Sequence, residues 1–411
     1  MLIIKNLSVF LFEYFNSHFN ILSLRNVYFD NAATTQLRSE VISTMTQVLQ
    51  TEFGNPSSTH DFGRSSKALI ETARKEVAQI LNVSASEIIF TSGGTEADNL
   101  VLNGCVKNLS VTRIISSKIE HHAVLYAIQE LQTSHNITVE YVNLDHCGAI
   151  DFNHLESLLA DTTQKTLVSL MHVNNEIGNI LDLKHVAALC KKYNTLFHSD
   201  TVQSIGHYHL DFSDIPIDFA AVAAHKFHGP KGVGFAFVRK NSGIRPMIVG
   251  GAQERGMRAG TEPVYAIVGM VEALKISYQN LAQEKKYITG LKDYFKESLV
   301  KEIPEIQFNG HCDDNDKSSY TVLNVCIPVS PEKGTMLLFQ LDLKGIACSK
   351  GSACQSGSNK GSHVLSEILK EEDLAKPSIR FSFSSFNTKD EIDYVVKTLT
   401  TFVKPGNVLE H

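Results

Sequence analysis

The sequence has no excess of positive charge. Its 411 residues include 38 Lys and Arg against 44 Asp and Glu, which gives a formal net charge of −6 at pH 7. Nucleic acids and anionic membrane surfaces are bound mainly through clusters of basic residues. The charge balance therefore argues against a nucleic-acid or membrane partner and favours a small-molecule ligand.

Long apolar runs are also missing. No segment reaches the roughly 18 apolar residues that a membrane-spanning helix needs. The first 26 residues are apolar, but the charge-free stretch 6–12 is short for a signal-peptide core and Glu13 follows it. No small-residue cleavage site comes after it. We therefore expect residues 1–27 to be an N-terminal extension of undefined role rather than a secretory signal.

The seven cysteines show no paired spacing. An odd number of cysteines scattered through a long chain is typical of reduced thiols, so we expect a cytoplasmic location and at least one free thiol. Internal repeats and low-complexity linkers are absent as well. Because single cores stop growing at roughly 250–300 residues, the length predicts a large domain with a smaller one packed firmly against it.

What the chain does contain, between residues 88 and 238, is an alternation of short β-branched runs with amphipathic segments. The helices expected there include 123–131, 154–159 and 183–193. Such alternation predicts the α/β class, with a mostly parallel seven-stranded sheet and helices on both faces. The predicted strands are 88–90, 113–116, 138–142, 166–173, 195–198, 218–223 and 233–238.

The pattern changes after Gly250-Gly251. A helical stretch is expected over 263–302, and a second α/β segment follows it. Its predicted strands are 320–327, 345–348 and 378–383, and its predicted helices are 336–341 and 388–403. We therefore divide the chain into the extension 1–27, a large domain 28–265, and a linking helix with a small C-terminal domain, 266–411.

Three predicted strand ends carry side chains that a buried strand does not need. Lys226 follows the apolar run 218–223 and precedes a Gly-Pro-Lys-Gly turn. Partial desolvation lowers the pKa of an ammonium group and makes the amine a usable nucleophile and base. Asp200 ends another strand, and Thr95 lies in a glycine-rich turn before an apolar helix, where backbone amides favour a phosphate. Each feature alone also fits an ordinary turn or helix cap.

Taken together, these residues match the needs of pyridoxal phosphate. A lysine forms the Schiff base with this cofactor, an acid keeps its pyridine nitrogen protonated, and hydrogen-bond donors anchor its phosphate. Ligands of parallel α/β sheets bind beyond the carboxyl ends of the strands, which is where Lys226, Asp200 and Thr95 are expected. The sequence therefore predicts a pyridoxal phosphate site.

Eight motifs, in order along residues 28–386, resemble those of the NifS/IscS-type cysteine desulfurases. These enzymes are class V aminotransferase-like members of the fold type I pyridoxal phosphate transferases. The motifs are GNPSSTH (54–60), TSGGTEADN (91–99), SKIEH (117–121), MHVNNEIG (171–178), HSDTVQSIG (198–206), HKFHGPKG (225–232), ERGMRAGT (254–261) and GSACQS (351–356).

The resemblance implies a role for each matched residue. Lys226 would be the covalent anchor of the cofactor and a base, and His121 would stack on the ring and transfer protons. Asp200 would pair with the pyridine nitrogen, and Gln203 would contact the phenolic oxygen. Asn175 would lie beside the ring and the substrate.

The phosphate and substrate contacts also follow from the resemblance. Gly94, Thr95 and His225 would hold the phosphate, and Thr261 would reach the phosphate of a neighbouring subunit in a homodimer. Arg380 would grip the substrate carboxylate through a two-pronged guanidinium contact.

Cys354 lies in a Gly/Ser/Asn-rich loop of the C-terminal domain, where an exposed thiol is a liability unless it is used. In the family that it resembles, the matching cysteine takes sulfur from cofactor-bound L-cysteine and leaves L-alanine. The implied activity is a sulfurtransferase that carries a persulfide on Cys354. An acceptor protein, such as an iron–sulfur scaffold or a sulfur carrier for tRNA thiolation, would then receive the sulfur.

Other interpretations stay open at this point. A selenocysteine lyase shares the chemistry, an aminotransferase shares the fold and lysine but leaves Cys354 without a role, and a non-catalytic cofactor-binding protein is the third. Cys348 either packs as a small apolar residue at a strand end or resolves the Cys354 persulfide. Ala223 stands where the family commonly has a phosphate-binding serine, and one missing neutral hydrogen bond is worth about 1 kcal/mol.

Overall fold

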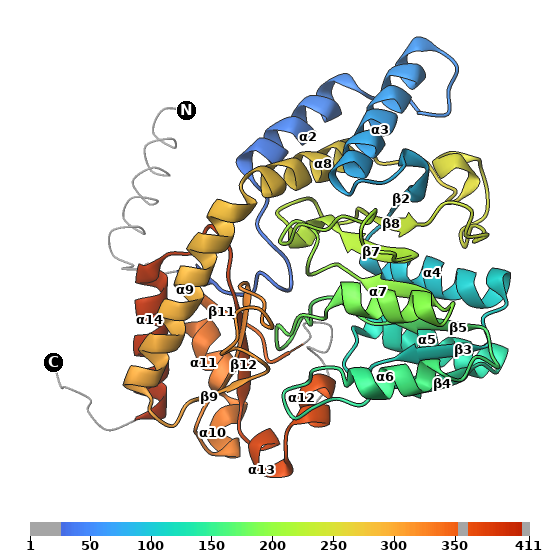
Figure 1. Ribbon diagram of the computed structural model, residues 1–411. Helices are drawn as coiled ribbons and strands as arrows, with labels where there is room; N and C mark the ends of the chain where they lie inside the picture. Colours follow the sequence, from blue (N-terminus) through green and yellow to red (C-terminus); the bar gives the residue numbers. More distant parts are fainter. Residues whose placement is uncertain (1–25, 352–360, 405–411) are drawn as a thin grey trace, which may run out of the picture.

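The structure, a computed structural model, describes residues 26–351 and 361–404. A central seven-stranded sheet has the order β2-β8-β7-β6-β5-β3-β4, and β8 runs antiparallel to both of its neighbours while the other six strands are parallel (Figure 1). The α/β class and the mostly parallel sheet are thereby confirmed. The strands are β2 (Ile88–Thr91), β3 (Arg113–Ser116), β4 (Thr138–Tyr141), β5 (Thr166–Ser169), β6 (Leu196–Asp200), β7 (Phe219–Ala223) and β8 (Gly234–Val238).

Helices cover both faces of this sheet. Side chains alternate between the faces along each strand, so Ile88 and Phe90 join one apolar core while Ile89 joins the other. On the Ile89 face pack α4 (Gly94–Leu109) and α5 (His122–His135). The opposite core includes α2 (Ser39–Thr51), α3 (Asp61–Ile80), α6 (Phe152–Leu159), α7 (Leu183–Lys192) and α8 (Val264–Gln279). We call this part of the molecule the sheet lobe.

A second, smaller lobe forms around another apolar core that includes Phe295, Phe381 and Leu399. Its antiparallel sheet has the order β12-β10-β9, and β1 pairs in parallel with β11. The strands are β1 (Val27–Tyr28), β9 (Gln307–Asn309), β10 (Val322–Cys326), β11 (Ile346–Ala347) and β12 (Ser378–Ser382). The helices are α9 (Leu281–Glu302), α10 (Pro331–Thr335), α11 (Leu337–Leu343), α13 (Glu371–Leu374) and α14 (Lys389–Val403). We call this part of the molecule the C-terminal lobe. The short helix α12 (His363–Ile368) packs instead against Ile119 and Ile177 of the sheet lobe.

Two details differ from the sequence-based expectation. The predicted helical stretch 263–302 is two helices, α8 and α9, which meet at Asn280. Leu274 of α8 packs in the core of the sheet lobe, whereas Leu291 of α9 packs in the C-terminal lobe. At the other end of the large domain, Val27 and Phe29 also pack in the C-terminal lobe. The chain therefore passes from the C-terminal lobe to the sheet lobe near residue 30 and returns near residue 280. The domain limits 28–265 and 266–411 stay predictions.

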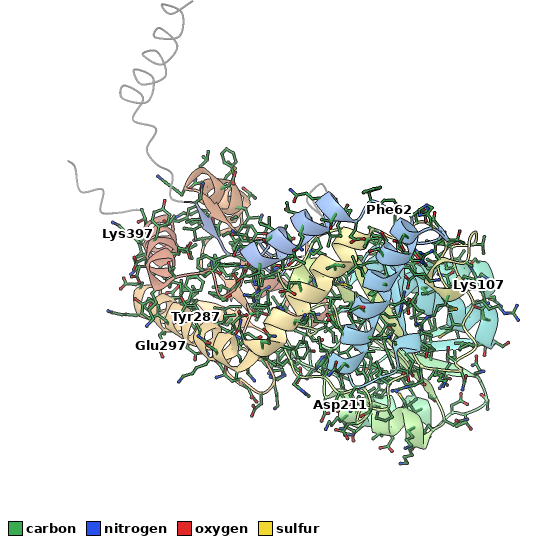
Figure 2. The ribbon with its side chains drawn as sticks, turned by 90° about the horizontal axis from the view of Figure 1, so that it is seen from above. Phe62, Lys107, Asp211, Tyr287, Glu297 and Lys397 are labelled. Atoms are coloured by element: carbon green, nitrogen blue, oxygen red, sulfur yellow. The ribbon has the colours of Figure 1, made fainter. Side chains whose placement is uncertain are left out.

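The two lobes lie at opposite ends of the molecule. Seen from above in Figure 2, Phe62 and Lys107 mark the sheet lobe, and Tyr287 and Lys397 mark the C-terminal lobe. Helices α8 and α9 run between these ends. Within residues 26–351 and 361–404, no helix combines the length and apolar character that crossing a membrane requires.

A buried ion pair joins α3 to the segment that precedes α8. Arg74 donates from Nη1 to Glu254 Oε2 at 2.6 Å and from Nη2 to Oε1 at 2.8 Å, and both side chains are buried. Glu254 Oε2 also accepts from the Phe90 amide at 2.8 Å, and Arg74 Nη1 donates to the Ile88 carbonyl. The pair therefore ties α3, edge strand β2 and the 3-10 turn Gln253–Gly256 together.

We predict that Glu254→Gln lowers the free energy of unfolding by about 3 kcal/mol, because it removes the buried partner of Arg74 and leaves this charge with the half-buried Glu71 carboxylate, 3.2 Å from its Nε. Equilibrium unfolding in urea measures the change. Asp214→Asn is the matched control, because Asp214 pairs with Lys184 at an exposed position and such pairs contribute about 1 kcal/mol or less. Equal effects of the two substitutions would contradict the assignment.

Candidate active site

A cavity of about 200 Å³ opens where the carboxyl ends of the parallel strands face the C-terminal lobe. The predicted site residues that line it are Gly94, Thr95, His121, Asn175, Asp200, Gln203, His225, Lys226 and Arg380. Exposed Thr261 is not among the lining residues. Cys354 lies outside the described residues. The structure thus brings the predicted residues together, apart from these two.

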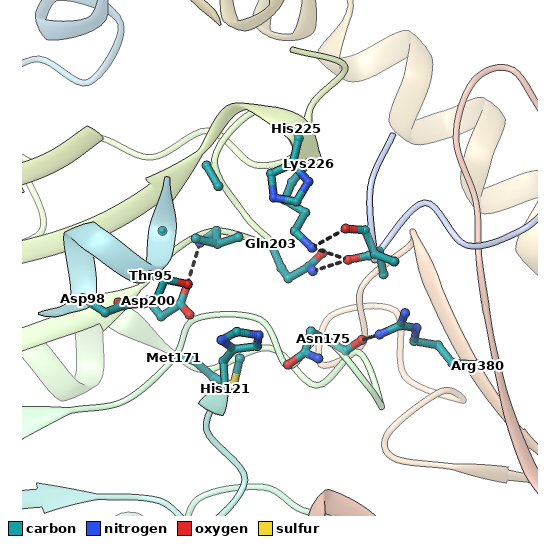
Figure 3. Close-up of a pocket in the computed structure, with 15 residues that line it drawn as sticks. Thr95, Asp98, His121, Met171, Asn175, Asp200, Gln203, His225, Lys226 and Arg380 are labelled. Carbon is teal, nitrogen blue, oxygen red and sulfur yellow. Dashed lines mark hydrogen bonds between the residues drawn. The ribbon is translucent and has the colours of Figure 1, made fainter. Parts of the chain in front are cut away.

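Lys226 reaches into the cavity from the turn that follows β7. Its Nζ donates to the carbonyl oxygens of Ala32 at 2.7 Å and Ala33 at 2.8 Å, as Figure 3 shows. Gln203 Nε2 donates to the same Ala32 oxygen at 2.9 Å. The amine is therefore held by backbone acceptors at the cavity wall.

Two carboxyl groups, Asp200 and Asp98, lie across the cavity from this amine (Figure 3). Asp200 ends β6, and its Oδ1 accepts from the Val202 amide at 2.9 Å. Burial raises the pKa of Asp200 to about 6, although the Val202 amide and the positive charge of Lys226 oppose the shift. The pKa of Asp98 is raised well above its usual range by burial and by the nearby Asp200 and Glu120 carboxylates.

His121 lies between these groups, at the start of α5. Its Nδ1 accepts from the Ala123 amide at 3.1 Å and caps the helix. Burial, with the charge of Lys226 as the next cause, lowers the pKa of His121 to about 4. The ring is therefore neutral near pH 7, and because Nδ1 accepts a hydrogen bond, the proton is on Nε2.

Donors for an anion gather where α4 begins. The first amides of a helix have no acceptor within the helix, and those of Gly94 and Thr95 are at this position. A Cβ at Gly94 would lie 2.6 Å from Val202 Cγ2, so the close approach requires glycine. His225 Nδ1 is buried and has no hydrogen-bond partner among the described residues, and burial lowers the pKa of this ring to about 4.

The C-terminal lobe contributes Arg380, from β12. Its Nη2 donates to Asp30 Oδ1 at 2.9 Å and its Nη1 donates to the Asn175 carbonyl at 2.8 Å. Arg380 Nε is buried without a hydrogen-bond partner within the described part of the chain. The guanidinium is thus oriented by both lobes and retains an unused donor at the cavity.

Some lining residues were not predicted from the sequence. Ala32 and Ala33 act through backbone carbonyls, which leave no side-chain signal. Asp98 is inside a recognised motif, but on a helix its side chain cannot be placed from the sequence alone. Met171 lies inside the predicted strand 166–173, but β5 ends at Ser169, so the strand prediction was too long and placed Met171 in the sheet rather than at its edge.

Cys348 follows β11 and packs against the core of the C-terminal lobe. Burial, together with the nearby Asp30 carboxylate, raises the pKa of its thiol, which disfavours the reactive thiolate. This environment favours the interpretation of Cys348 as a packing residue over a role in resolving a persulfide.

Comparison with known proteins identifies the family. The model of the aminotransferase class-V family matches residues 27–395. A curated cysteine desulfurase IscS from Dictyoglomus turgidum is 40% identical over 382 residues, covering 92% of this chain and 95% of the relative. A solved NifS-like protein superposes with a TM-score of 0.84 at 35% identity, over 92% of this chain and 99% of the other.

The chain belongs to the IscS/NifS-type cysteine desulfurases. The predicted family is thereby confirmed, and with it a pyridoxal phosphate-dependent enzyme class. Another solved relative, described as SspA in complex with cysteine, has a TM-score of 0.74 at 30% identity. The match covers 88% of this chain and 100% of the SspA chain. A putative cysteine desulfurase IscS 1 from Bacillus subtilis is 38% identical, and the match covers 93% of this chain and 99% of the Bacillus protein.

The residues of the cavity fit pyridoxal phosphate. The group needs an amine, an acid and several phosphate donors, and Lys226, Asp200 and the start of α4 offer these in one cavity. An anionic group at that position would also give the unpartnered His225 Nδ1 a ligand.

Glu120, directly before His121, carries a pH-dependent part of the stability. Its Oε1 accepts from Ser117 Oγ at 2.6 Å and its Oε2 accepts from the Met171 amide at 2.9 Å. Burial raises the pKa of Glu120 from 4.5 to about 8, despite these hydrogen bonds. Because the folded pKa is higher than the unfolded one, the group's contribution is complete below pH 4.5 and is lost as the pH rises to about 8.

We predict that Glu120→Gln removes this loss. The parent loses up to about 1.4 kcal/mol per pH unit through this group, whereas a neutral glutamine can accept from Met171 and donate to Ser117 at any pH. Urea unfolding between pH 5 and about 8.5 tests this. The exposed Glu130→Gln is the control. A variant that follows the parent's pH dependence would show that Glu120 is not the group responsible.

Proposed function

We propose that this chain removes sulfur from L-cysteine with pyridoxal phosphate bound in the Lys226 cavity. The products would be L-alanine and a persulfide on Cys354. The observation that carries the proposal is the placement of the Lys226 amine and the Asp200 carboxyl on opposite sides of one cavity, with His121 between them (Figure 3). When bound, the cofactor supplies an electron sink for the substrate carbon that loses a proton.

Lys226 is proposed to anchor the cofactor and then to move the α-proton of the substrate. The Ala32 and Ala33 carbonyls hold its amine at the wall of the cavity. His121 offers a second proton at Nε2, because its other ring nitrogen is occupied by the Ala123 amide. Asp200 is the acid proposed to hold the pyridine nitrogen.

The remaining contacts are proposed to orient cofactor and substrate. The amides at the start of α4, with Thr95 and His225, would hold the phosphate. Gln203 and Asn175 would contact the ring and the substrate, and Arg380 would bind the substrate carboxylate. Gln203, Asn175 and Arg380 are buried, which limits water at these groups and strengthens their electrostatic contacts.

We also propose the family's homodimer, in which Thr261 approaches the cavity of the partner subunit. Exposed apolar side chains at Phe53, Phe62 and Val249 support a partner on the sheet lobe, with exposed fractions of 75%, 57% and 81%. A sulfur-acceptor protein and a cytoplasmic location complete the proposal. The acceptor follows from the reaction, because the persulfide sulfur must be passed on before the next turnover. The unpaired spacing of the seven cysteines supports the location.

The covalent anchor can be tested without measuring turnover. We predict that borohydride reduction fixes the cofactor to the Lys226 peptide of the parent, and that Lys226→Ala retains no reducible adduct after dialysis. Lys231→Ala is the matched control, because this exposed lysine lies in the same turn. Absorption spectra and peptide mass spectrometry give the readout. An adduct on another lysine would overturn the assignment.

The sulfur carrier is tested by mass spectrometry after exposure to L-cysteine. We predict an adduct of about 32 Da on the Cys354 peptide of the parent and none in Cys354→Ala. Cys348→Ser should carry the same adduct as the parent, because Cys348 packs against an apolar core. Loss of the adduct in Cys348→Ser would instead support a role in sulfur handling, and an adduct in Cys354→Ala would remove Cys354 from the proposal.

Arg380→Lys tests substrate binding. Lysine cannot form the two-pronged contact, so we predict a rise of about 10- to 100-fold in the KM for cysteine with the cofactor absorption retained. The control is Arg245→Lys at an exposed position. An unchanged KM would exclude Arg380 from carboxylate binding, and loss of the cofactor absorption would indicate a role in holding the cofactor instead.

A further inference from the structure

Two loops outside the Lys226 cavity bring together side chains that ligate metals. One is the turn that contains Asp145, His146 and Cys147, and their ligand atoms all lie within 4.8 Å of one another. The other follows β9 and contains His311, whose Nε2 lies 3.5 Å from Asp145 Oδ2. Neither loop was singled out by the sequence motifs, and neither lines the Lys226 cavity.

The side chain of Asn179 forms hydrogen bonds with both loops and fixes their relative position. Asn179 Nδ2 donates to the Cys147 carbonyl at 2.7 Å, and Asn179 Oδ1 accepts from the His311 amide at 2.9 Å. A glycine in each loop allows this approach: a Cβ on Gly310, at φ +82°, would lie 2.7 Å from Asn179 Oδ1, and one on Gly148, at φ +83°, would lie 2.9 Å from a neighbouring side chain. The relative position of the loops is therefore fixed by contacts outside the cluster.

The donor atoms have capacity for an ion. Asp145 Oδ1 is occupied by the amides of Cys147 at 2.8 Å and Ala149 at 2.9 Å, which leaves Oδ2 directed at His311. His311 Nε2 is buried and has no hydrogen-bond partner in the part of the chain that the structure describes. The Asp145 side chain is thus oriented by its own turn, and the imidazole nitrogen beside it is unused.

The set of donors selects a class of metal. A thiolate, imidazoles and a carboxylate suit a borderline-soft divalent ion such as Zn²⁺. The ligand atoms of Asp145, His146 and Cys147 lie within 4.8 Å of one another, and His311 approaches this group on the side of Asp145. Burial, followed by the charges of Asp145 and Asp313, raises the pKa of the Cys147 thiol. The same acidic charges favour a cation at this position.

We propose that Asp145, His146, Cys147 and His311 form a Zn²⁺-binding site, separate from the proposed cofactor cavity. Asp145 and His311 also line a larger cavity, of about 550 Å³, in which Glu120 and Met171 take part. Met171 lines the Lys226 cavity as well, so the two cavities share this residue. Solvent can reach the two ligands through the larger cavity.

Cobalt provides the test, because Co²⁺ replaces Zn²⁺ and reports its ligands in the absorption spectrum. The cofactor-loaded enzyme with Cys354→Ala, which removes the loop thiol, should bind one Co²⁺ per chain with a thiolate-to-metal charge-transfer band. Zn²⁺ should displace it stoichiometrically. Cys147→Ser should abolish the band, and His311→Gln should weaken Co²⁺ and Zn²⁺ binding by at least about 10-fold. Asn179→Ala should weaken binding by about 10- to 100-fold because it frees the two loops.

His135→Gln is the control for a histidine on the surface, since His135 ends α5 away from both loops. The proposal is overturned if the Cys354→Ala enzyme takes up no stoichiometric Co²⁺ or shows no thiolate band. It is also overturned if Cys147→Ser and His311→Gln bind Co²⁺ as tightly as His135→Gln does. Because none of these readouts involves cysteine turnover, they stand or fall independently of the proposed sulfur transfer.

Discussion

Parallel strand direction is the constraint on which the candidate active site depends. Six of the seven strands in the central sheet run the same way, so their carboxyl ends meet along one edge. Asp200 ends β6, Lys226 follows β7 and His121 follows β3, and the edge therefore collects residues that are far apart in the chain. The antiparallel β8 supplies no lining residue, which agrees with this explanation.

Burial then sets the charge of the collected groups. Asp98, Asp200 and Glu120 lie so deep that their pKa values rise, and the rings of His121 and His225 lose their positive charge for the same reason. Among the described residues that line the cavity, Lys226 and Arg380 are the remaining basic side chains besides the neutral histidines. The electrostatic field of the cavity is thus governed by a few charges in a medium of low polarizability, where each has a strong effect.

Much of this arrangement could be predicted from the sequence, because strand periodicity and the residues at strand ends are local signals. The strand 113–116 and the positions of Lys226 and Asp200 are of this kind. The break at Asn280 could not be predicted, since apolar periodicity continues on both sides and only the change of packing partner ends α8. The Ala32 and Ala33 carbonyls and the burial of Asp98 depend on tertiary packing, so no residue pattern reports them.

The pairing of β1 with β11 has a consequence for how the chain can fold. Phe29 is fully buried in the C-terminal lobe, where its ring contacts Phe295, Phe381 and Phe383. The first described residues thus complete a core whose other members are synthesised last. During translation β1 therefore stays unpaired until β11 has been synthesised, when most of the chain has left the ribosome. A C-terminal fragment that begins near residue 280 would lack Val27 and Phe29, and its apolar core would be incomplete.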